Sequence, residues 1–326
     1  MKKKVLVSGI QSSGSLHIGN YFGAMKQNIE LANSGEYDSY IFIADYHSMT
    51  TLTDGEERRR NTFEIACAYL ACGLDTSKVA LFKQSDVSEH TELAWVLNTV
   101  TPMPMLSLAH AFKDSEAKSK DVNAGLFTYP VLMAADILIY KGDVVPVGKD
   151  QEQHIEIARE IAGKFNRAYS ELFMMPKAYI KKEVAVVPGT DGQKMSKSKG
   201  NVIPLFGSDE EVKKAVMSIV TDSVTPEEKK NPNESTLYAI HSLFLNEDEV
   251  TSLRAKFENG GYGYKQAKEE LLATIMEWRK DIKERYDDLV AHPEKVYAIL
   301  EEGKEKARAH AQVTMEEVRK VVGLTL

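Results

Sequence analysis

The chain has 326 residues and a formal net charge of −7, with 43% hydrophobic and 27% charged residues. This composition is that of a globular protein with room for an α/β domain and a smaller second domain. The negative charge argues against non-specific binding of nucleic acid. No apolar stretch reaches the roughly 18 residues of a membrane span, and none near the start has the length of a signal peptide. We therefore expect a cytoplasmic protein with no membrane contact.

The first twenty residues predict a strand, a glycine-containing loop and the start of a helix. Val5 to Val7 form a short apolar run that suits a buried parallel strand. Gly9 and Gly14 punctuate the polar loop that follows, and helical spacing begins at Leu16. Backbone N–H groups and the positive end of a helix dipole meet in such a corner, which therefore indicates a phosphate-binding site.

This corner carries neither of the two common phosphate-loop motifs. In their place stands His17-Ile18-Gly19-Asn20. His17 and Asn20, three residues apart, fall on one face of the first helical turn, where both could donate to phosphate oxygens. Gly19 leaves room for a flat ring or a ribose. The alternative is that His17 only caps the helix or is solvated.

Strands and helices alternate through the next part of the chain. We expect a helix over 24–32, a strand over 40–44, a helix over 58–71, a strand over 79–82 and a helix over 92–100. This alternation predicts a doubly wound parallel sheet. Asp45 and His47 follow the strand at 40–44, at the edge where such sheets bind ligands, although a hydrogen-bonded turn explains them equally well.

The two cysteines, Cys67 and Cys72, lie five residues apart in an apolar helical segment. Two thiols are too few for a zinc site, and cytosolic cysteines are usually reduced and buried. We interpret both as core residues and expect no protein-bound structural metal.

A nearly apolar helical stretch over 128–140 carries a single carboxylate, Asp136. A buried ionised carboxylate without a partner is costly. Asp136 must therefore accept hydrogen bonds, either from the protein or from a ligand. Residues 113–120, before this stretch, are polar and charged and indicate a mobile loop or a frayed helix end.

Residues 143–154 repeat the order of strand, glycine and helix found at the N-terminus. Gly148 would allow close backbone approach to a ligand. Asp150 could cap the next helix, accept from a ribose hydroxyl, or do both.

Lys194-Met195-Ser196-Lys197-Ser198 lies between glycines at 189, 192 and 200. Two lysines and two serines on a loop with glycine hinges would form a mobile cation clamp for a polyphosphate leaving group. The alternative is a basic surface loop. After residue 207 the pattern is helical to the end, which predicts a Rossmann-like domain over 1–207 and a helical domain over 208–326.

The two motifs together resemble the signatures of class I aminoacyl-tRNA synthetases. His-Ile-Gly-Asn is similar to their first motif, and Lys-Met-Ser-Lys-Ser matches the second in full. Further stretches resemble bacterial tryptophanyl-tRNA synthetases over nearly the whole chain, among them 9–14, 133–138, 145–154 and 218–223. One departure is Ser12, where the family usually has proline.

The resemblance implies a set of functional residues. Those implied in catalysis are Gln11, His17, Asn20, Lys194 and Lys197. Those implied in ATP binding are Gln11, Ser12, Ser13, Gly19, Asn20, Gly148, Lys149, Asp150, Val186, Lys194, Met195, Ser196, Lys197 and Ser198. Those implied in tryptophan binding are Tyr129, Met133, Asp136, Val145, Val147 and Gln151.

The implied activity is the ligation of tryptophan to tRNA(Trp), with ATP as substrate, Mg²⁺ as its ion and tryptophanyl-adenylate as intermediate. Asp136 would accept from the indole N–H, and a lysine within 113–120 could reach pyrophosphate. The family resemblance also implies a homodimer, with its interface near 90–125 and chiefly over 101–108. The helical domain would read the anticodon, and its last helix could pack back on the catalytic domain.

Three other functions stay open at this stage. Tyrosyl-tRNA synthetases share the fold, but Asp136 within Met-Ala-Ala-Asp favours tryptophan. A nucleotidyltransferase outside translation could use a similar corner, although the long helical region argues against it. A non-catalytic sensor of tryptophan or RNA would have no leaving group to neutralise, so the lysine-rich motif disfavours it.

Overall fold

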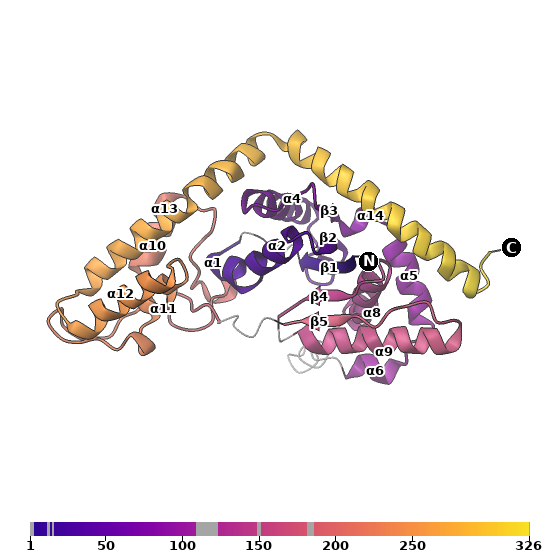
Figure 1. Cartoon of the computed structure of the whole chain (residues 1–326), viewed down its shortest axis with the longest axis horizontal. Coiled ribbons are helices and arrows are strands. Elements are labelled where there is room, and N and C mark those ends of the chain that lie inside the picture. The colour runs from indigo at the N-terminus through magenta and orange to yellow at the C-terminus, as the bar shows by residue number, and fades with distance from the viewer. Residues whose placement is uncertain are drawn as a thin grey trace. The chain divides into compact units, whose positions relative to one another are not determined.

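The computed structural model describes residues 3–11, 14, 16–108, 123–148, 151–180 and 186–325. The chain divides into two compact units (Figure 1). Unit 1 comprises Met1–Gly14, Asn28–Lys182 and Leu289–Leu326, and unit 2 comprises Ser15–Gln27 and Glu183–Asp288. This division does not follow the expected boundary after residue 207: segments on both sides of that boundary belong to each unit.

Unit 1 is built on a parallel sheet, as the alternation of strands and helices predicts. Its five strands have the order β3-β2-β1-β4-β5. They are β1 (Lys4–Gln11), β2 (Tyr37–Ala44), β3 (Val79–Lys83), β4 (Val144–Pro146) and β5 (Lys177–Tyr179). Val7 pairs with Tyr40 and Gln11 with Ala44, so β1 and β2 end side by side. The doubly wound α/β fold is confirmed, with β5 as a strand that the sequence did not indicate.

Helices flank this sheet. They are α3 (Asp45–Ser48), α4 (Gly55–Ala71), α5 (Glu89–Asn98), α6 (Met103–Ser107), α8 (Ala124–Leu138), α9 (Glu152–Ala168) and α14 (Pro293–Val321), and α2 (Lys26–Asn33) connects the two units in sequence. Among the described residues, no helix combines the length and apolarity needed to cross a membrane.

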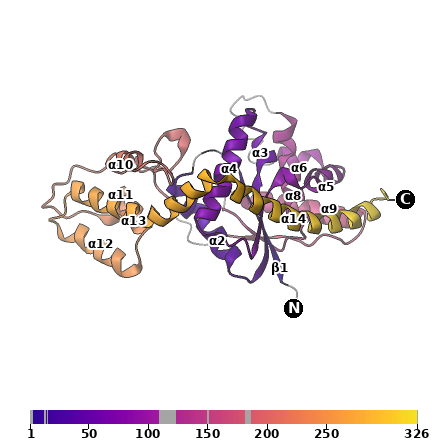
Figure 2. The same cartoon turned by 90° about the horizontal axis from the view of Figure 1, so that it is seen from above.

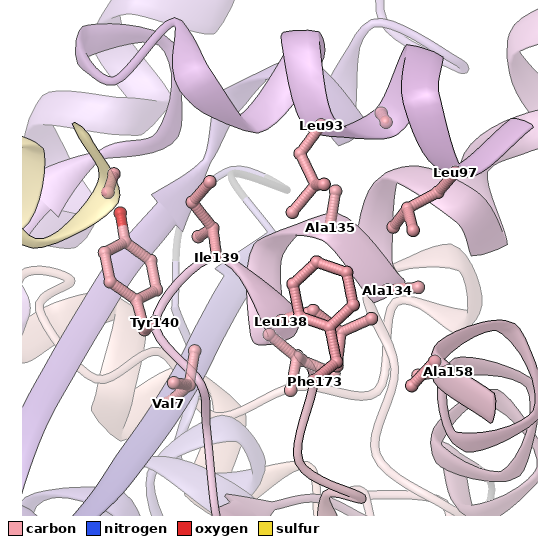
Figure 3. Packing of buried hydrophobic residues seen from close by; sticks show 14 of the residues in the cluster. Val7, Leu93, Leu97, Ala134, Ala135, Leu138, Ile139, Tyr140, Ala158 and Phe173 are labelled. Carbon is pink, nitrogen blue, oxygen red and sulfur yellow. The ribbon is translucent and has the colours of Figure 1, made fainter. Parts of the chain in front are cut away.

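The core of unit 1 lies where α5 and α8 pack on each other. Figure 3 shows Leu93 and Leu97 of α5 directed at Ala134, Ala135 and Leu138 on α8, all of them buried. Small alanine side chains on α8 let the two helices approach closely, and α9 packs on α8 in turn. The apolar run that predicts a helix over 128–140 is thus a central core element.

The last helix, α14, packs against β3 and α5 (Figure 1). β3 is an edge strand, so its free side would otherwise present unpaired backbone groups. Gly303 is what permits the close contact, since a Cβ atom there would lie 1.9 Å from the Leu81 carbonyl oxygen.

Unit 2 is mainly helical. It contains α1 (Ile18–Asn20), the π-helix η1 (Tyr21–Met25), the 3₁₀ helix η4 (Lys197–Lys199), α10 (Asp209–Met217), η5 (Pro232–Glu234), α11 (Thr236–Ser242), α12 (Glu247–Asn259) and most of α13 (Tyr264–Ala291). Figure 2 shows α11, α12 and α13 gathered in one cluster.

Two backbone hydrogen bonds and one aromatic contact explain why residues 15–27 belong to this helical unit. Ile18 N–H donates to the Ile203 carbonyl at 3.0 Å, and Leu205 N–H donates to the Leu16 carbonyl at 3.0 Å. In addition, Phe22 stacks on Trp278 of α13 with ring centroids 5.6 Å apart. Backbone pairing and aromatic packing therefore fix the His-Ile-Gly-Asn segment in unit 2.

Only one of the two cysteines is a core residue. Cys67 of α4 is fully buried, and burial raises the pKa of its thiol to about 12. Cys72 directly follows the end of α4 and is only partly buried. The expectation that both lie in the core is therefore wrong for Cys72, because the apolar face ends with the helix.

Candidate active site

A cavity of about 470 Å³ lies in unit 1, toward the carboxyl ends of β1 and β2. In a parallel sheet this is the edge where ligands are expected. All the residues expected to bind tryptophan line it: Tyr129, Met133, Asp136, Val145, Val147 and Gln151. Residues of β1, β2, α3 and α9 also line it, among them Gly9, Phe42, His47 and His154.

Asp136 lies at the cavity and is fully buried in α8. Its carboxylate accepts from Gln84 Nε2 at 2.7 Å and contacts His47 Nε2 at 2.8 Å and His90 Nδ1 at 2.6 Å. The sequence left open whether protein or ligand satisfies this group, and the structure shows that the protein supplies partners. Since a carboxylate has about four acceptor positions, it can still accept from a ligand N–H.

The partners of Asp136 decide its charge. Burial alone raises the pKa of a carboxyl group, but here the hydrogen bonds from His47 and His90, together with their charges, lower the pKa of Asp136 to about 2. His90 in turn contacts the Tyr140 hydroxyl through Nε2 at 2.7 Å. Burial raises the pKa of Tyr140 well above its usual value, so its hydroxyl keeps a proton to donate. The cavity therefore presents a fixed negative charge.

The sequence missed two of these partners. Gln84 directly follows β3, and the rule that ligand groups collect at the carboxyl ends of parallel strands could have found it. His90 lies in the first turn of α5. No motif or spacing around it in the sequence indicates that it contacts Asp136. His47 does line the cavity, whereas Asp45 accepts from the Ser85 backbone N–H at 2.9 Å and holds a turn.

A second hydrogen-bonded chain borders the cavity. The Tyr129 hydroxyl contacts His154 Nε2, and His154 Nδ1 lies 2.8 Å from Gln151 Oε1. Because the Gln151 oxygen can only accept, Nδ1 carries the proton and Nε2 accepts from Tyr129. Burial raises the pKa of Tyr129 to about 12, which keeps that proton in place. The Tyr129 oxygen at the cavity therefore keeps its lone pairs for accepting hydrogen bonds.

Unit 2 carries the first of the two motifs. His17 precedes α1, and its backbone N–H donates to Asn20 Oδ1 at 3.0 Å. The residue is 7% exposed, and the ring nitrogen Nδ1 has no hydrogen-bond partner within the described part of the chain. Burial, and secondly the charge of Lys197, lower the pKa of His17 to about 4. At pH 7 the ring is therefore neutral, with one N–H to donate.

Gly19 has a packing role that the sequence did not reveal. A Cβ atom at this position would lie 2.9 Å from His17 Nδ1 and 3.2 Å from Met195 Sδ. Met195, expected among the ATP-binding residues, is only 5% exposed. Its side chain therefore anchors the second motif to the first.

The second motif forms what we call the lysine loop, residues 187–201. Met195 N–H donates to the Val187 carbonyl at 3.0 Å, which closes a hairpin, and the 3₁₀ helix η4 follows. Gly192 and Gly200 have φ angles of 80° and 67°, so both occupy the left-handed region that favours glycine. The lysines at 194 and 197 are exposed. This is the glycine-flanked cation loop that the sequence predicts.

The remaining residues expected to bind ATP are divided between the units. Gln11 and Gly148 belong to unit 1, and Gln11 lines the cavity. Val186 belongs to unit 2 and is 65% exposed. Ser12, Ser13, Lys149, Asp150 and the lysines of 113–120 lie outside the described residues.

Residues 2–278 match the family model of class I tRNA synthetases for W and Y. The parallel sheet and the two motifs agree with this class, and the chain belongs to this family. Over 319 residues it is 51% identical to the tryptophan–tRNA ligase of Fusobacterium nucleatum, with 98% of this chain and 97% of that protein covered. It therefore belongs, within the family, to the bacterial tryptophanyl-tRNA synthetases.

Solved structures agree with this placement. The Campylobacter jejuni tryptophanyl-tRNA synthetase complexed with ADP and tryptophan is 44% identical and has a TM-score of 0.91, with 98% of this chain and 99% of that chain covered. The Mycoplasma pneumoniae tryptophanyl-tRNA synthetase is 29% identical with a TM-score of 0.82, and 99% of each chain is covered.

Proposed function

We propose that this tryptophan–tRNA ligase binds tryptophan in the cavity of unit 1 and ATP phosphates through the two motifs of unit 2. The observation that carries the first part is that every residue expected to bind tryptophan lines one cavity around an ionised carboxylate. The cavity volume of about 470 Å³ is in the range of small-molecule sites.

Asp136 would accept from the indole N–H, which is a donor without acceptor capacity. The protein already supplies hydrogen-bond donors to this carboxylate. A substrate without an N–H would therefore leave only one acceptor position of the carboxylate unpaired, and its other positions would keep their partners. Shape must therefore contribute to selectivity. Met133, Val145 and Val147 would provide apolar walls for the flat ring.

Tyr129 and Gln151 would hold the substrate α-ammonium group. An ammonium needs acceptors, and the Tyr129 oxygen offers them because its own proton is directed at His154. His154, which also lines the cavity, holds both side chains through its two ring nitrogens. We assign it as a positioning residue that the sequence did not predict.

In the first step, the tryptophan carboxylate would attack the α-phosphorus of ATP in line, and pyrophosphate would leave. Lys194 and Lys197 would neutralise the charge that develops on pyrophosphate. Neutral His17, with Asn20 and Gln11, would donate to phosphate oxygens. The other proposed ATP contacts are Ser12, Ser13, Gly19, Gly148, Lys149, Asp150, Val186, Met195, Ser196 and Ser198, with backbone groups acting at Gly19, Val186 and Met195.

In the second step, a ribose hydroxyl at the 3′ end of tRNA(Trp) would attack the adenylate carbonyl, and AMP would leave. No protein nucleophile is needed, so catalysis would rest on positioning and charge stabilisation. Within the described residues, no group of three or more His, Cys, Asp or Glu side chains could hold a metal ion. We propose that Mg²⁺ is bound mainly through ATP phosphates, as is usual for this ion.

The helical domain expected over 208–326 would contact the tRNA anticodon, and we propose that it does so through the part that belongs to unit 2, residues 208–288. We also propose a homodimer with an interface that includes α6 and the residue after it. Met103 of α6 is 68% exposed, and Leu108, which directly follows α6, is 58% exposed. Exposed large apolar side chains close together are typical of protein interfaces.

A cytoplasmic location is proposed from the role of the reaction in protein synthesis.

The decisive experiment is ATP–pyrophosphate exchange with tryptophan, with tyrosine and without amino acid. We expect exchange with tryptophan alone and its loss in Asp136→Ala and Lys197→Ala. Exchange with tyrosine at a comparable rate would contradict the proposed indole recognition. A homodimer can be tested separately by light scattering.

A further inference from the structure

Asn201 has a buried amide inside the lysine loop. It is 2% exposed. Its Oδ1 accepts from Ser196 N–H at 2.7 Å, and its Nδ2 donates to the Lys194 carbonyl at 3.2 Å and to Asp191 Oδ1 at 2.6 Å. One side chain thus bonds to the loop backbone on both sides of Met195 and to the turn before it.

Asparagine is suited to this position by its chemistry. The amide offers an acceptor and two donor hydrogens, and all of them find partners here. An aspartate could accept from Ser196 but could not donate to the Lys194 carbonyl, and it would repel Asp191. An apolar residue would leave a buried N–H and a buried carbonyl unpaired, which is costly.

The turn of the lysine loop is built around this amide. A Cβ atom on Gly189 would lie 2.3 Å from Asn201 Nδ2 and 2.6 Å from its carbonyl oxygen. The same carbonyl accepts from Thr190 N–H at 2.9 Å. Because Gly189 has no side chain, Asn201 can occupy the space beside it. The contacts of Asn201 then join the end of the lysine loop to its start.

Closure of the loop fixes the backbone that carries the functional lysines. Met195, between the two Asn201 contacts, packs beside Gly19 of the first motif. The Lys194 side chain is exposed and long, so its contribution to the transition state depends on a fixed starting point in the backbone. Without the Asn201 amide, the loop backbone would adopt many conformations, and the charges of Lys194 and Lys197 would not be held in one place.

We propose that Asn201 is a positioning residue for adenylate formation, acting through Lys194 and Lys197. This inference rests on the role proposed above for these lysines. Asn201 touches neither tryptophan nor the reacting phosphorus; it sets where the cations stand when pyrophosphate departs.

The first variant is Asn201→Ala. We expect kcat for ATP–pyrophosphate exchange to fall about 10- to 100-fold. The dissociation constant for tryptophan, measured by equilibrium dialysis, should change less than about twofold, since the cavity residues belong to unit 1. Asn33→Ala is the matched control, because it removes an amide of unit 1 that likewise donates to a backbone carbonyl, that of Gly73, and accepts from a backbone N–H, that of Asp75. This variant should leave exchange unchanged.

A double-mutant cycle with Lys194→Ala separates positioning from a merely structural effect. If Asn201 acts through Lys194, Asn201→Ala should cost little more in the Lys194→Ala background, so the two effects should be strongly non-additive. Fully multiplicative effects, or a wild-type kcat in Asn201→Ala, would overturn the inference. If Lys194→Ala and Lys197→Ala keep wild-type exchange, the proposed role of the lysines fails first and the inference fails with it.

Asp191→Ala keeps the test informative if Asn201→Ala does not fold. Asp191 is exposed, so its removal does not open the core, but it deletes one anchor of the Asn201 amide. We expect a fall in kcat in the same direction and smaller, with the tryptophan dissociation constant unchanged. An unchanged kcat in this variant, with Asn201→Ala unfolded, would count against the inference.

Discussion

His90 Nδ1 lies 2.6 Å from Asp136 Oδ1, and the two side chains are 0% and 1% exposed. This contact joins a side chain of α5 to a side chain of α8, across the helix–helix interface in the core of unit 1. It holds a charge next to the substrate cavity, and it also joins two helices. Stability and the proposed recognition of tryptophan therefore depend on the same hydrogen bond.

His90→Ala should lower the free energy of unfolding by about 2–3 kcal/mol, because a buried carboxylate loses a donor and a cavity opens. Urea denaturation of wild type and variant measures this difference. Thr91→Ala, one residue further along α5 and exposed, is the control and should change stability by less than about 0.5 kcal/mol. A stable His90→Ala protein would show that Gln84 and His47 suffice.

The titration of His17 predicts a pH dependence of stability. Its pKa in the folded protein is about 4, against an ordinary value of 6.5, so between these values the unfolded chain binds more protons than the folded chain. The stability contributed by His17 is present above pH 6.5 and is lost as the pH falls through about 4. His17→Gln should flatten the stability profile over this window. Denaturation at several pH values is the measurement, and an unchanged profile would contradict the burial of the ring.

Asp136 contributes in a lower pH range. Its pKa is lowered from 3.8 to about 2, so its contribution is complete above pH 3.8 and is lost as the pH falls toward 2. Asp136→Asn removes the titrating group, and the difference in stability between wild type and variant should shrink with acidification. Should the difference stay constant from pH 5 to the lowest accessible pH, the carboxylate would not be the group that titrates.

Tyr129→Phe tests the ammonium contact. The ring and its packing stay, while the oxygen proposed to accept from the substrate is lost, and with it the proton donated to His154. We expect KM for tryptophan to rise about tenfold, which corresponds to one hydrogen bond to a charged group, with KM for ATP nearly unchanged. Tyr297→Phe, an exposed ring on α14, should behave like wild type. A change in kcat alone would place Tyr129 elsewhere in the mechanism.

Gly303→Ala should destabilise unit 1. The new Cβ atom would lie 1.9 Å from the Leu81 carbonyl oxygen, so α14 must move away from β3, at a cost of about 1–3 kcal/mol. Gly55→Ala is the matched control, since no atom lies within 4 Å of the added Cβ. Thermal unfolding measures both, and equal midpoints would show that α14 adjusts without cost.

The features that could be predicted from the sequence are those set by residues close together in the chain. The strand at Val5–Val7, the apolar helix around Asp136 and the glycines of the lysine loop all follow from short-range patterns. The strand β1 continues to Gln11, so the polar loop expected at Gly9 is wrong, because pairing with β2 extends the strand through these residues. The need of Asp136 for a partner could also be inferred, because a buried charge is costly in any fold.

The identity of that partner could not be inferred, because His90 is 46 positions away from Asp136 in the sequence and only the packing of α5 on α8 joins them. The same holds for the division into units. The pairing of Ile18 with Ile203 and the stacking of Phe22 on Trp278 decide where the first motif belongs, and neither leaves a periodic signal.

The position of α14 has a consequence for biosynthesis. β3 is complete once residue 83 has been made, but the helix that covers its edge begins only at Pro293. A nascent chain therefore carries an exposed strand edge while more than half of the protein is still to be translated. Such edges invite pairing with other chains. Early termination before α14 should accordingly yield an aggregation-prone product, one that cellular quality control would have to remove.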